Sequence, residues 1–491
     1  MGILRLLTFC LLLLILILPD AFGSGFTFDG LGVKAKGMGG AFRALADDWS
    51  AAYYNPAGYN HIADNILAFN TDFLHNRYSM TPSVSWGEEG YESGFYNEQE
   101  IYNKHEILSI PQAGVVFRLP VTSKIAALNE VVCGLAAIQL FDQNQTWELY
   151  ENIPAYASDS GAYPSKQYYN NLDVVAFQLT MATGFLEDER LSVGIGLQLL
   201  RADLNFNSVV LRDNPMESPI SDRPYDKIPE WYRNDGKGWG FGYRIGLLYR
   251  VNEKLDVGLV YNGPASIDIT GDTDLKFFFG DNYTLQGNYF DSTEQRYFID
   301  GNVEDVTAEF ETTLDLPASI GGGIAFKYND RLTLTLDGEY TFWSAFEGLD
   351  FAFTNYDGLP HSYLTHAISL IRTDMTNPVE WDDVARVMVG ANYLLKDYVE
   401  LRGGFAYDQS PTSSTTATPL FIDLGDKYSY SVGIGFQVDF WHLDFTTVYT
   451  HQPDLDVGNI SDVDGNGLMD NLSGLYKADN WQTILGISYR F

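Results

Sequence analysis

The sequence predicts an all-β transmembrane protein, an antiparallel β-barrel of about 14 strands plugged by a small N-terminal segment. Three observations lead to this prediction. Long stretches alternate between apolar residues and small or polar ones, the connections between them are short and long in turn, and the chain begins with an export signal.

Residues 1–23 have the features of a secretory signal peptide. Arg5 is the only early positive charge, Leu6–Leu18 is almost wholly apolar, and Ala21–Gly23 supplies small residues for cleavage. The apolar run is too short to span a bilayer, so we expect export and removal of this segment. Only Cys133 then remains, and no internal disulfide is expected.

Alternation with a period of two marks the strands. It is clear in Trp481–Phe491, Tyr428–Val438, Trp239–Arg250 and Val399–Asp408. A soluble β-sandwich also alternates. These stretches, however, are about ten residues or longer, as a tilted membrane crossing requires, and aromatic residues cluster at their ends. Their second face carries Gly, Ser, Gln and Arg, which is too small and polar for the core of a sandwich. The pattern therefore favours a transmembrane barrel.

The connections support this interpretation. Short ones occur at Leu186–Arg190, Val251–Lys254, Lys327–Arg331, Leu395–Tyr398 and Val438–His442. Long polar ones lie near 83–104, 143–168, 207–236, 272–312, 347–382, 409–426 and 453–478. Periplasmic turns and extracellular loops alternate in this way in outer-membrane barrels. An even number of strands closes the barrel, so that no strand edge faces lipid.

A separate unit, residues 24–62, precedes the barrel of residues 63–491. Its stretch Asp47–Asn60, "DDWSAAYYNPAGYN", has neither a helical nor a strand period and is rich in small residues. We predict that this unit, the hatch, fills the lumen. Proline fixes one backbone angle, asparagine bonds to nearby backbone, and alanine and glycine keep the turn thin. The candidate residues of this turn are Asn55, Pro56, Ala57 and Gly58.

Charge and motifs exclude several functions. A formal net charge of −35 argues against a nucleic-acid partner, because binding to phosphates requires Lys and Arg. No P-loop, Gly-x-Ser-x-Gly or Cys-x-x-Cys motif occurs, and the seven His are scattered. We therefore expect no enzyme and no cofactor. An outer-membrane hydrolase, with a triad assembled only in space, is the alternative from another class.

One stretch, "DVDGNGLMD", resembles a calcium-binding loop. Its oxygen donors alternate around Gly467, which permits the tight bend, but Ser473 replaces the final bidentate glutamate. A structural calcium ion, bound weakly, is one interpretation, and a polar loop between strands is the other. The candidate ligands are Asp462, Asp464, Asn466, Leu468 and Asp470.

Several motifs, in shared order and spacing, resemble the FadL-type outer-membrane transport family for long-chain fatty acids and hydrocarbons. The region Gly37–Gly58 resembles that family's hatch, with Asn-Pro-Ala at its end, and Gly238–Tyr249 resembles its sixth strand. The other matching motifs are Leu314–Pro317, Tyr340–Phe346, Asp408–Pro411 and the terminal Tyr-Arg-Phe.

The resemblance implies a protein of the outer membrane of a Gram-negative bacterium, surrounded by lipid and lipopolysaccharide, which we expect to be a monomer. It implies passive uptake of a hydrophobic small molecule, captured by the extracellular loops and passed beyond the hatch. Release is expected sideways, at a kinked third strand within Val131–Thr146. Porin-like passage of small polar solutes is the alternative function.

The nature of the substrate stays open at this point. Fatty-acid-transporting relatives carry basic residues at two lumen positions that here correspond to Ser208 and Asp382, so an uncharged hydrocarbon is one alternative. By parity Arg244, Arg386 and Arg402 point inward, to meet a carboxylate or to pair with acids such as Glu400 and Asp408. The stretch Leu275–Gly280 is apolar enough either to contact a ligand or to pack a loop. The substrate-binding candidates are Arg244, Arg386, Arg402, Phe277, Phe278 and Phe279.

Overall fold

The computed structural model describes residues 30–82, 100–104, 107–120, 130–148, 167–186, 189–222, 225–282, 284–285, 293–358, 374–418, 425–458, 461, 463–465 and 470–491. The predicted signal peptide lies outside the described residues. No helix in the described part of the chain is long and apolar enough to cross a membrane.

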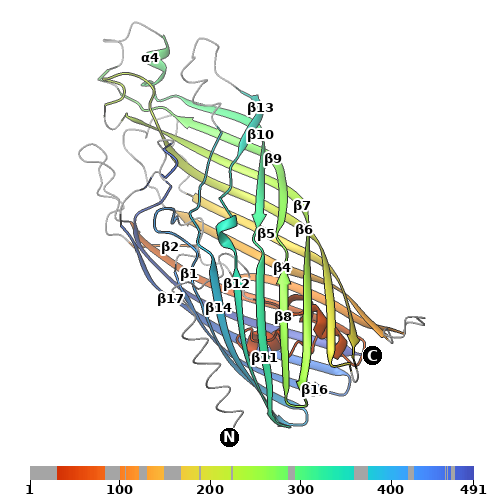
Figure 1. The fold of residues 1–491 in the computed structure, drawn as a ribbon. Coiled ribbons are helices and arrows are strands. Elements are labelled where there is room, and N and C mark those ends of the chain that lie inside the picture. The colour runs from red at the N-terminus through yellow and green to blue at the C-terminus, as the bar shows by residue number, and fades with distance from the viewer. Residues whose placement is uncertain are drawn as a thin grey trace.

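Long strands make up most of the protein, and the helices are short (Figure 1). The strands are β1 (Ile66–Pro82), β2 (Ile101–Tyr102), β3 (Ile107–Pro120), β4 (Glu130–Glu148), β5 (Gln167–Phe185), β6 (Leu191–Asp213), β7 (Lys227–Asn252), β8 (Leu255–Asn262), β9 (Ala265–Phe278), β10 (Val303–Leu316), β11 (Ser319–Asn329), β12 (Leu332–Thr341), β13 (Ala352–Asp357), β14 (Val384–Lys396), β15 (Val399–Asp408), β16 (Lys427–Val438), β17 (Trp441–Val457) and β18 (Gly474–Arg490). Among the described residues the helices are α2 (Val33–Gly37), α3 (Ala51–Tyr54), η1 (Pro56–His61), α4 (Thr293–Tyr297) and η5 (Trp343–Ala345).

The sheet closes on itself. Strand β1 pairs with β18 in an antiparallel ladder from Ile66↔Arg490 to Pro82↔Gly474, and with β3 on its other side. Four pairs of segments in the 18-stranded sheet, β2/β3, β8/β9, β10/β11 and β12/β13, are each one barrel strand that is interrupted. The result is a closed antiparallel barrel of 14 strands, which confirms the predicted fold class.

Two of the interruptions lie side by side. The break between β8 and β9 contains Pro264, and the break between β10 and β11 contains Pro317. The ladders on either side join Leu316 to Ala265 and Ser319 to Asn262, so the two breaks face each other. Because proline lacks the N–H that a ladder requires, both strands bend at the same height of the wall.

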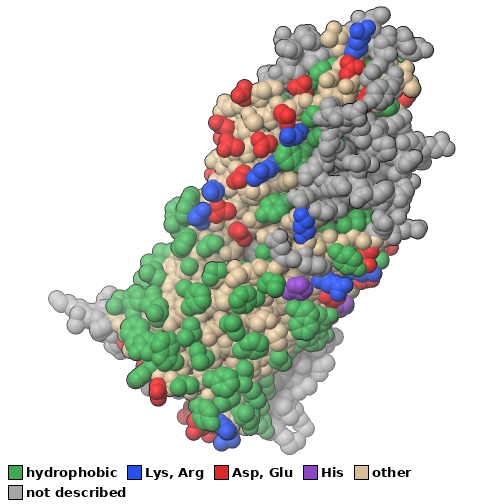
Figure 2. Space-filling model, turned by 180° about the vertical axis from the view of Figure 1, so that it is seen from behind, with side chains coloured by type: hydrophobic (Ala, Val, Ile, Leu, Met, Phe, Trp, Pro, Cys, Tyr) green, Lys and Arg blue, Asp and Glu red, His purple; other side chains and the backbone are tan. Residues whose placement is uncertain are grey.

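The outer surface changes from apolar to polar partway along the strands. On β6 the outward residues are Leu191, Val193, Ile195, Leu197 and Leu199, followed by Arg201, Asp203, Asn205 and Asn207. An apolar band about 25 Å tall is typical of outer-membrane barrels. Figure 2 shows hydrophobic side chains gathered over the lower part of the barrel and most acidic and basic ones over the upper part, with a few at the lower tip. The polar ends of the strands therefore project beyond the membrane.

This extension corrects the predicted loop boundaries. Much of the predicted connections 207–236 and 272–312 is strand, because β6 continues to Asp213, β7 begins at Lys227 and β9 continues to Phe278. Alternation persists there, but with polar residues on the outer face, so the sequence resembles a polar loop.

A charge placed in the apolar belt tests this membrane boundary. Leu197→Arg is expected to lower the free energy of unfolding by about 2–4 kcal/mol, because the guanidinium would face hydrocarbon. Asn205→Arg, on the same face of the same strand but above the boundary, is expected to change it little. Guanidinium unfolding in lipid vesicles, followed by tryptophan fluorescence, measures both variants. If both variants lost the same free energy of unfolding, the membrane boundary would lie elsewhere on the strand.

Candidate functional site

The described part of the predicted hatch, residues 30–62, lies inside one end of the barrel (Figure 1). Helix α2 contacts β15, β16 and β17, whereas η1 contacts β4, β5, β6 and β7. The wall has little room there: a Cβ atom on Gly194 of β6 would lie 2.3 Å from the backbone nitrogen of Ala57. Small residues on the inner face thus allow the segment to lie directly against the strands.

Asn55 joins the turn of the hatch to the wall. Its Nδ2 donates to the backbone oxygens of Arg43 (2.8 Å) and of Leu247 in β7 (3.0 Å). Its Oδ1 accepts a hydrogen bond from the N–H of Ala57 (3.1 Å), and the side chain is fully buried. A Cβ atom on Gly246 would lie 2.1 Å from that Oδ1. Asn55 therefore fixes two segments of the hatch and one strand at a single point.

The other three predicted hatch residues are buried beside Asn55. Pro56, Ala57 and Gly58 open η1, and Asn55 is its N-cap. A Cβ atom on Gly58 would lie 2.2 Å from the backbone oxygen of Ala46. Their small size permits this close packing, and their role in transport stays a prediction.

Two buried ion-pair groups hold the α2 side of the hatch. Lys36 pairs with Asp72 of β1 at 3.0 Å, and both side chains are almost completely buried. Arg43 pairs with Asp337 and Glu339 of β12. Asp337 also accepts the backbone N–H of Arg43 at 2.7 Å. Removing one partner of such a pair is costly, so this side is firmly attached.

Some charges of the hatch are balanced within the hatch. Lys34 pairs with Asp47 at 2.9 Å, and Asp48 accepts hydrogen bonds from the backbone and the hydroxyl of Ser50. Burial, together with neighbouring Asp47, raises the pKa of Asp48. Burial lowers the pKa of His61 to about 4, so His61 is neutral at pH 7.

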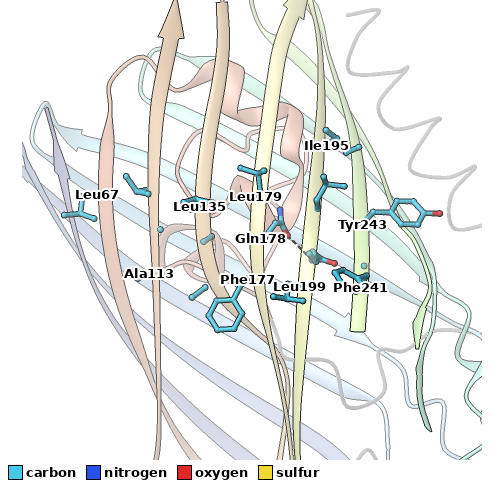
Figure 3. A pocket seen from close by; sticks show the side chains of 17 residues that line it. Leu67, Ala113, Leu135, Phe177, Gln178, Leu179, Ile195, Leu199, Phe241 and Tyr243 are labelled. Atoms are coloured by element: carbon cyan, nitrogen blue, oxygen red, sulfur yellow. Dashed lines mark hydrogen bonds between the residues drawn. The ribbon is translucent and has the colours of Figure 1, made fainter. Parts of the chain in front are cut away.

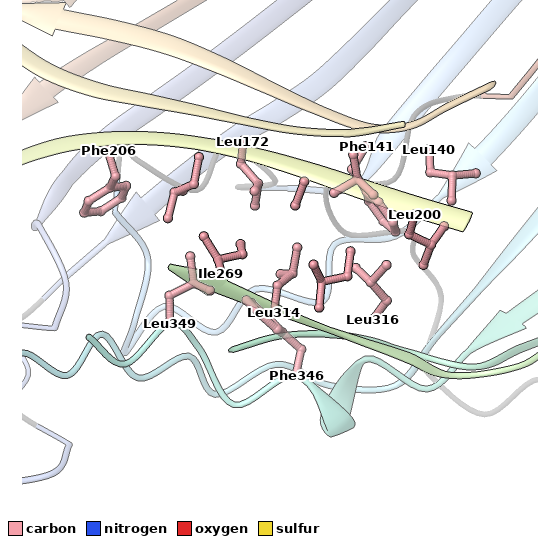
Figure 4. Close-up of a cluster of buried hydrophobic side chains, with 14 of the residues drawn as sticks. Leu140, Phe141, Leu172, Leu200, Phe206, Ile269, Leu314, Leu316, Phe346 and Leu349 are labelled. Atoms are coloured by element: carbon pink, nitrogen blue, oxygen red, sulfur yellow. The ribbon is translucent and has the colours of Figure 1, made fainter. Parts of the chain in front are cut away.

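Beyond the hatch the interior of the barrel becomes apolar (Figure 4). Side chains from β4, β5, β6, β9 and β10 and from the segment around η5 meet in one buried cluster. Among them are Leu140, Phe141, Leu172, Leu200, Phe206, Ile269, Leu314, Leu316, Phe346 and Leu349. An interior of this kind suits a hydrophobic ligand better than a polar one.

A cavity of about 80 Å³ lies between the hatch and this apolar cluster. One side is apolar and includes Leu140, Phe141 and Leu316, and the other carries Arg244, Glu339 and Arg386. Tyr53 of the hatch forms part of the lining. The cavity is thus amphipathic and touches both the hatch and β4.

The three predicted lumen arginines are all buried, but their partners differ. Arg402 pairs with Glu400 (2.7 Å) and with Asp444. Arg386 lies 3.6 Å from Asp408. Among the described residues, no carboxylate forms an ion pair with Arg244, which instead donates to the backbone oxygen of Tyr53. The structure therefore separates Arg244 from the other two.

Strand β4 contains a bulge at the height of this cavity. Its register with β5 shifts between Gln139↔Val175 and Phe141↔Val174, so Leu140 is an additional residue. Leu140 and Phe141 are consecutive and both buried. A bulge bends its strand and disrupts the ladder locally.

The wall opens beside the bulge. Strand β3 pairs with β4 only from Ala113↔Ala137 to Pro120↔Glu130. Residues 107–112 of β3 and 138–145 of β4 have no ladder between them, and the N–H of Lys104 reaches the backbone oxygen of Thr146 at 2.9 Å beyond this opening. We call the unpaired stretch the wall gap.

An apolar groove of about 1050 Å³ borders the wall gap on the outside of the barrel (Figure 3). It is lined mainly by outward side chains of β4, β5, β6 and β7, with Ala113 of β3 and Ala137 of β4 at the edge of the gap. The labelled members include Leu67, Leu135, Phe177, Leu179, Ile195, Leu199, Phe241 and Tyr243.

The remaining candidates lie elsewhere. Phe277, Phe278 and Phe279 are buried near the extracellular end, where Phe279 packs edge-on against Tyr297 and Phe298 around α4. This arrangement fits the alternative in which these residues pack a loop, and a role in ligand contact stays a prediction.

The predicted calcium loop is only partly visible. Asp462, Asn466 and Leu468 lie outside the described residues. Asp464 accepts a hydrogen bond from Thr376 (2.7 Å), and Asp470 accepts one from the N–H of Val463 (2.6 Å). The described residues contain no group of three or more His, Cys, Asp or Glu side chains arranged for a metal. Calcium binding stays a prediction.

The closed barrel and its apolar belt define an outer-membrane β-barrel. The chain belongs to the outer membrane protein transport protein family (OMPP1/FadL/TodX), whose model matches residues 16–491. The resemblance carried by the motifs is therefore confirmed, and the predicted location in the outer membrane of a Gram-negative bacterium is confirmed with it.

Curated relatives match part of the chain. Outer membrane protein P1 of Haemophilus influenzae is 20% identical over 305 residues, which cover 57% of this chain and 58% of that protein. A long-chain fatty acid transport protein of Salmonella typhi is 22% identical over 268 residues, which cover 53% and 55%. The chain thus spans somewhat over half the length of these relatives.

Solved structures match almost the whole chain. A FadL homologue of Pseudomonas aeruginosa has a TM-score of 0.70 at 17% identity and covers 95% of this chain and 100% of its own. The toluene transporter TodX of P. putida has a TM-score of 0.63 at 15% identity and covers 94% and 99%. At these identities the likeness shows the fold. The family and these structures are transport proteins rather than enzymes.

Proposed function

We propose that the protein takes up hydrophobic compounds passively across the outer membrane, by a route past the hatch and out through the side of the barrel. The observation that carries this proposal is the continuity of apolar surface. The buried apolar cluster, the amphipathic cavity, the wall gap and the outer groove follow one another around the bulge of β4.

The route has a physical rationale. A hydrophobic molecule gains about 25 cal/mol for each Å² of apolar surface that it removes from water, so an apolar interior on the extracellular side attracts it. Passage straight down the barrel is blocked by the hatch. The wall gap, next to Leu140 and Phe141, instead leads to a groove whose outward residues face the membrane. The molecule therefore stays in apolar surroundings until it reaches lipid.

Several features argue against porin-like passage of polar solutes. A porin lumen is water-filled and lined by polar groups. Here the hatch fills one end of the lumen, and Trp343, Phe206 and Phe310 are among the fully buried side chains further along.

Whole-cell uptake of radiolabelled dodecanol tests the proposal. Gram-negative cells that lack their own carrier for hydrophobic compounds are expected to accumulate it several times faster when they express this protein. Liposomes containing the protein are expected not to swell in sucrose. Uptake equal to that of empty-vector cells would refute the proposal, and rapid swelling would favour the porin alternative.

Loosening the hatch is expected to impair this uptake. Asn55→Ala removes three hydrogen bonds of the hatch, one of them to β7, each worth on the order of 1 kcal/mol, without removing any contact between strands. Hydrogen exchange of residues 51–61 is expected to rise about tenfold or more, while heat-modifiable gel mobility stays that of a folded barrel.

Asn252→Ala is the matched control, because Asn252 caps the exposed turn before Lys254 and does not touch the hatch. It is expected to leave uptake and hatch exchange unchanged. An Asn55→Ala protein with normal exchange and normal uptake would show that this side chain does not secure the hatch.

A further inference from the structure

We propose that Trp343 and Phe141 form an aromatic gate inside the barrel, which admits hydrophobic molecules no wider than a single six-membered ring and excludes fused-ring compounds. The inference rests on the proposed function and names the substrate class that the proposed route accepts. The gate lies where the buried apolar cluster meets the amphipathic cavity.

The two rings meet across the interior of the barrel. Phe141 belongs to β4 and Trp343 to η5, and their ring centres lie 6.4 Å apart in an edge-to-face arrangement. Around the wall, β5, β6, β7, β8/β9 and β10/β11 separate the two on one side, and β14 to β18, β1 and β2/β3 separate them on the other. The rings therefore come from nearly opposite sides. Because both are buried, their contact closes the interior at this height.

The pair lies between the cavity and the apolar cluster. Phe141 lines the cavity, as does Thr341, which ends β12 two residues before Trp343. Since β12 leaves the short turn after β11 and runs toward the extracellular side, Trp343 lies on the extracellular side of the cavity. Beyond it are Phe346 and Leu349 of the cluster, and Figure 4 shows Phe141 and Phe346 on opposite sides of that cluster. A molecule that moves from the cluster to the wall gap therefore passes between the two rings.

Trp343 is the fixed half of the gate. Its ring packs edge-on against Trp381, with the ring centres 5.0 Å apart, and against Phe346 at 6.1 Å. The N–H of Ser344 donates to the carboxylate of Asp383 at 3.0 Å, which attaches η5 to the segment before β14. Moving Trp343 would thus disturb two further aromatic side chains.

Phe141 is the half that moves. It follows Leu140, the additional residue of the β4 bulge, and it lies in the stretch 138–145 that has no ladder with β3. A bulge disrupts the ladder locally, and here the strand has a partner on one side only. The ring of Phe141 can therefore turn aside without breaking a continuous sheet.

The space that this movement opens sets the size limit. The cavity of about 80 Å³ is too small for a six-membered ring, since a cavity of about 150 Å³ is known to hold benzene. Turning Phe141 aside adds the space of its own phenyl ring. A straight alkyl chain or a single ring then fits. A fused-ring compound is wider than the space that one phenyl group leaves, so it would also have to displace Trp343.

Uptake of two primary alcohols that differ in width tests the gate. The probes are radiolabelled dodecanol and pyrenylmethanol, which share a neutral head, given to the carrier-deficient cells described above. After subtraction of the empty-vector rate, the wild type is expected to take up dodecanol about tenfold faster or more, because a filled apolar site can discriminate this strongly against even one additional methylene.

Variants assign the exclusion to the two rings. Phe141→Ala and Trp343→Ala are each expected to raise uptake of pyrenylmethanol by about tenfold. Phe298→Ala is the matched control, because it removes an equally buried ring that packs against Phe279 and Tyr297 near α4, away from the gate. It is expected to keep pyrenylmethanol out. Heat-modifiable gel mobility verifies folding, and Phe141→Leu, which shortens the side chain but keeps it apolar, replaces Phe141→Ala if that variant does not fold.

Three results would overturn the proposal: wild-type uptake of pyrenylmethanol as fast as that of dodecanol, no gain in any folded variant of the gate, or an equal gain in Phe298→Ala. The first comparison needs no variant. The proposed function fails separately, if cells with the wild type take up dodecanol no faster than empty-vector cells.

Discussion

Deletion of Leu140 is expected to reduce uptake of dodecanol to the level of cells without the protein. Leu140 is the additional residue of the β4 bulge, and without it the alternation between Ile138 and Phe141 becomes regular. A regular β4 can extend its ladder with β3 past Ala113↔Ala137 and close the wall gap. Because the change restores the regular alternation and allows additional ladder hydrogen bonds, the barrel is expected to fold as well as the wild type.

Leu140→Ala is the matched control. It shortens the same side chain but retains the additional residue, so the bulge and uptake are expected to persist. Heat-modifiable gel mobility verifies that both variants fold. Normal uptake by the deletion variant would mean that the compound does not leave through the wall gap.

Deletion of residues 25–60 is expected to give a folded barrel that conducts small ions, whereas the wild type does not. The barrel closes through β1 and β18 and does not need the hatch for its ladders. Asp72, Asp337 and Glu339 would lose their partners Lys36 and Arg43 and face water instead. The apolar cluster narrows the remaining path, so the conductance is expected to be limited to small ions.

Planar bilayers measure this conductance directly. Asn55→Ala, which loosens the hatch without removing it, is expected to stay closed. If the deletion variant shows no new conductance, the hatch is not what closes the barrel.

Much of the wall could be predicted from the sequence, because a side chain that faces lipid must be apolar whatever its neighbours are. The alternation in Trp481–Phe491 and Trp239–Arg250 therefore predicts each strand and distinguishes its two faces. The same logic fails above the membrane. Beyond Leu199 the outward residues of β6 are Arg201 and Asp203. Outside the membrane the outer face of the strand can carry polar side chains, so its sequence resembles that of a loop.

The site could be predicted only in part. Parity places Arg244, Arg386 and Arg402 in the lumen, but their partners come from other strands and from the hatch, which no local pattern reveals. Asp444, a partner of Arg402, lies 42 residues away along the chain. The bulge did leave a signal, since Leu140 and Phe141 are adjacent large apolar residues that break the alternation of β4. Tyr53, whose backbone oxygen Arg244 holds, left none.

Photocrosslinking during uptake tests the sideways path directly. Cells expressing the protein would be given a twelve-carbon alkyl alcohol that carries a diazirine and would be irradiated during uptake. The modified peptides would then be identified by mass spectrometry. Adducts are expected in the apolar cluster around Leu172 and Leu314, at Phe141 beside the wall gap, and on outer-groove residues such as Phe177. Adducts in the interior and along the periplasmic end of the hatch, with none in the outer groove, would contradict it.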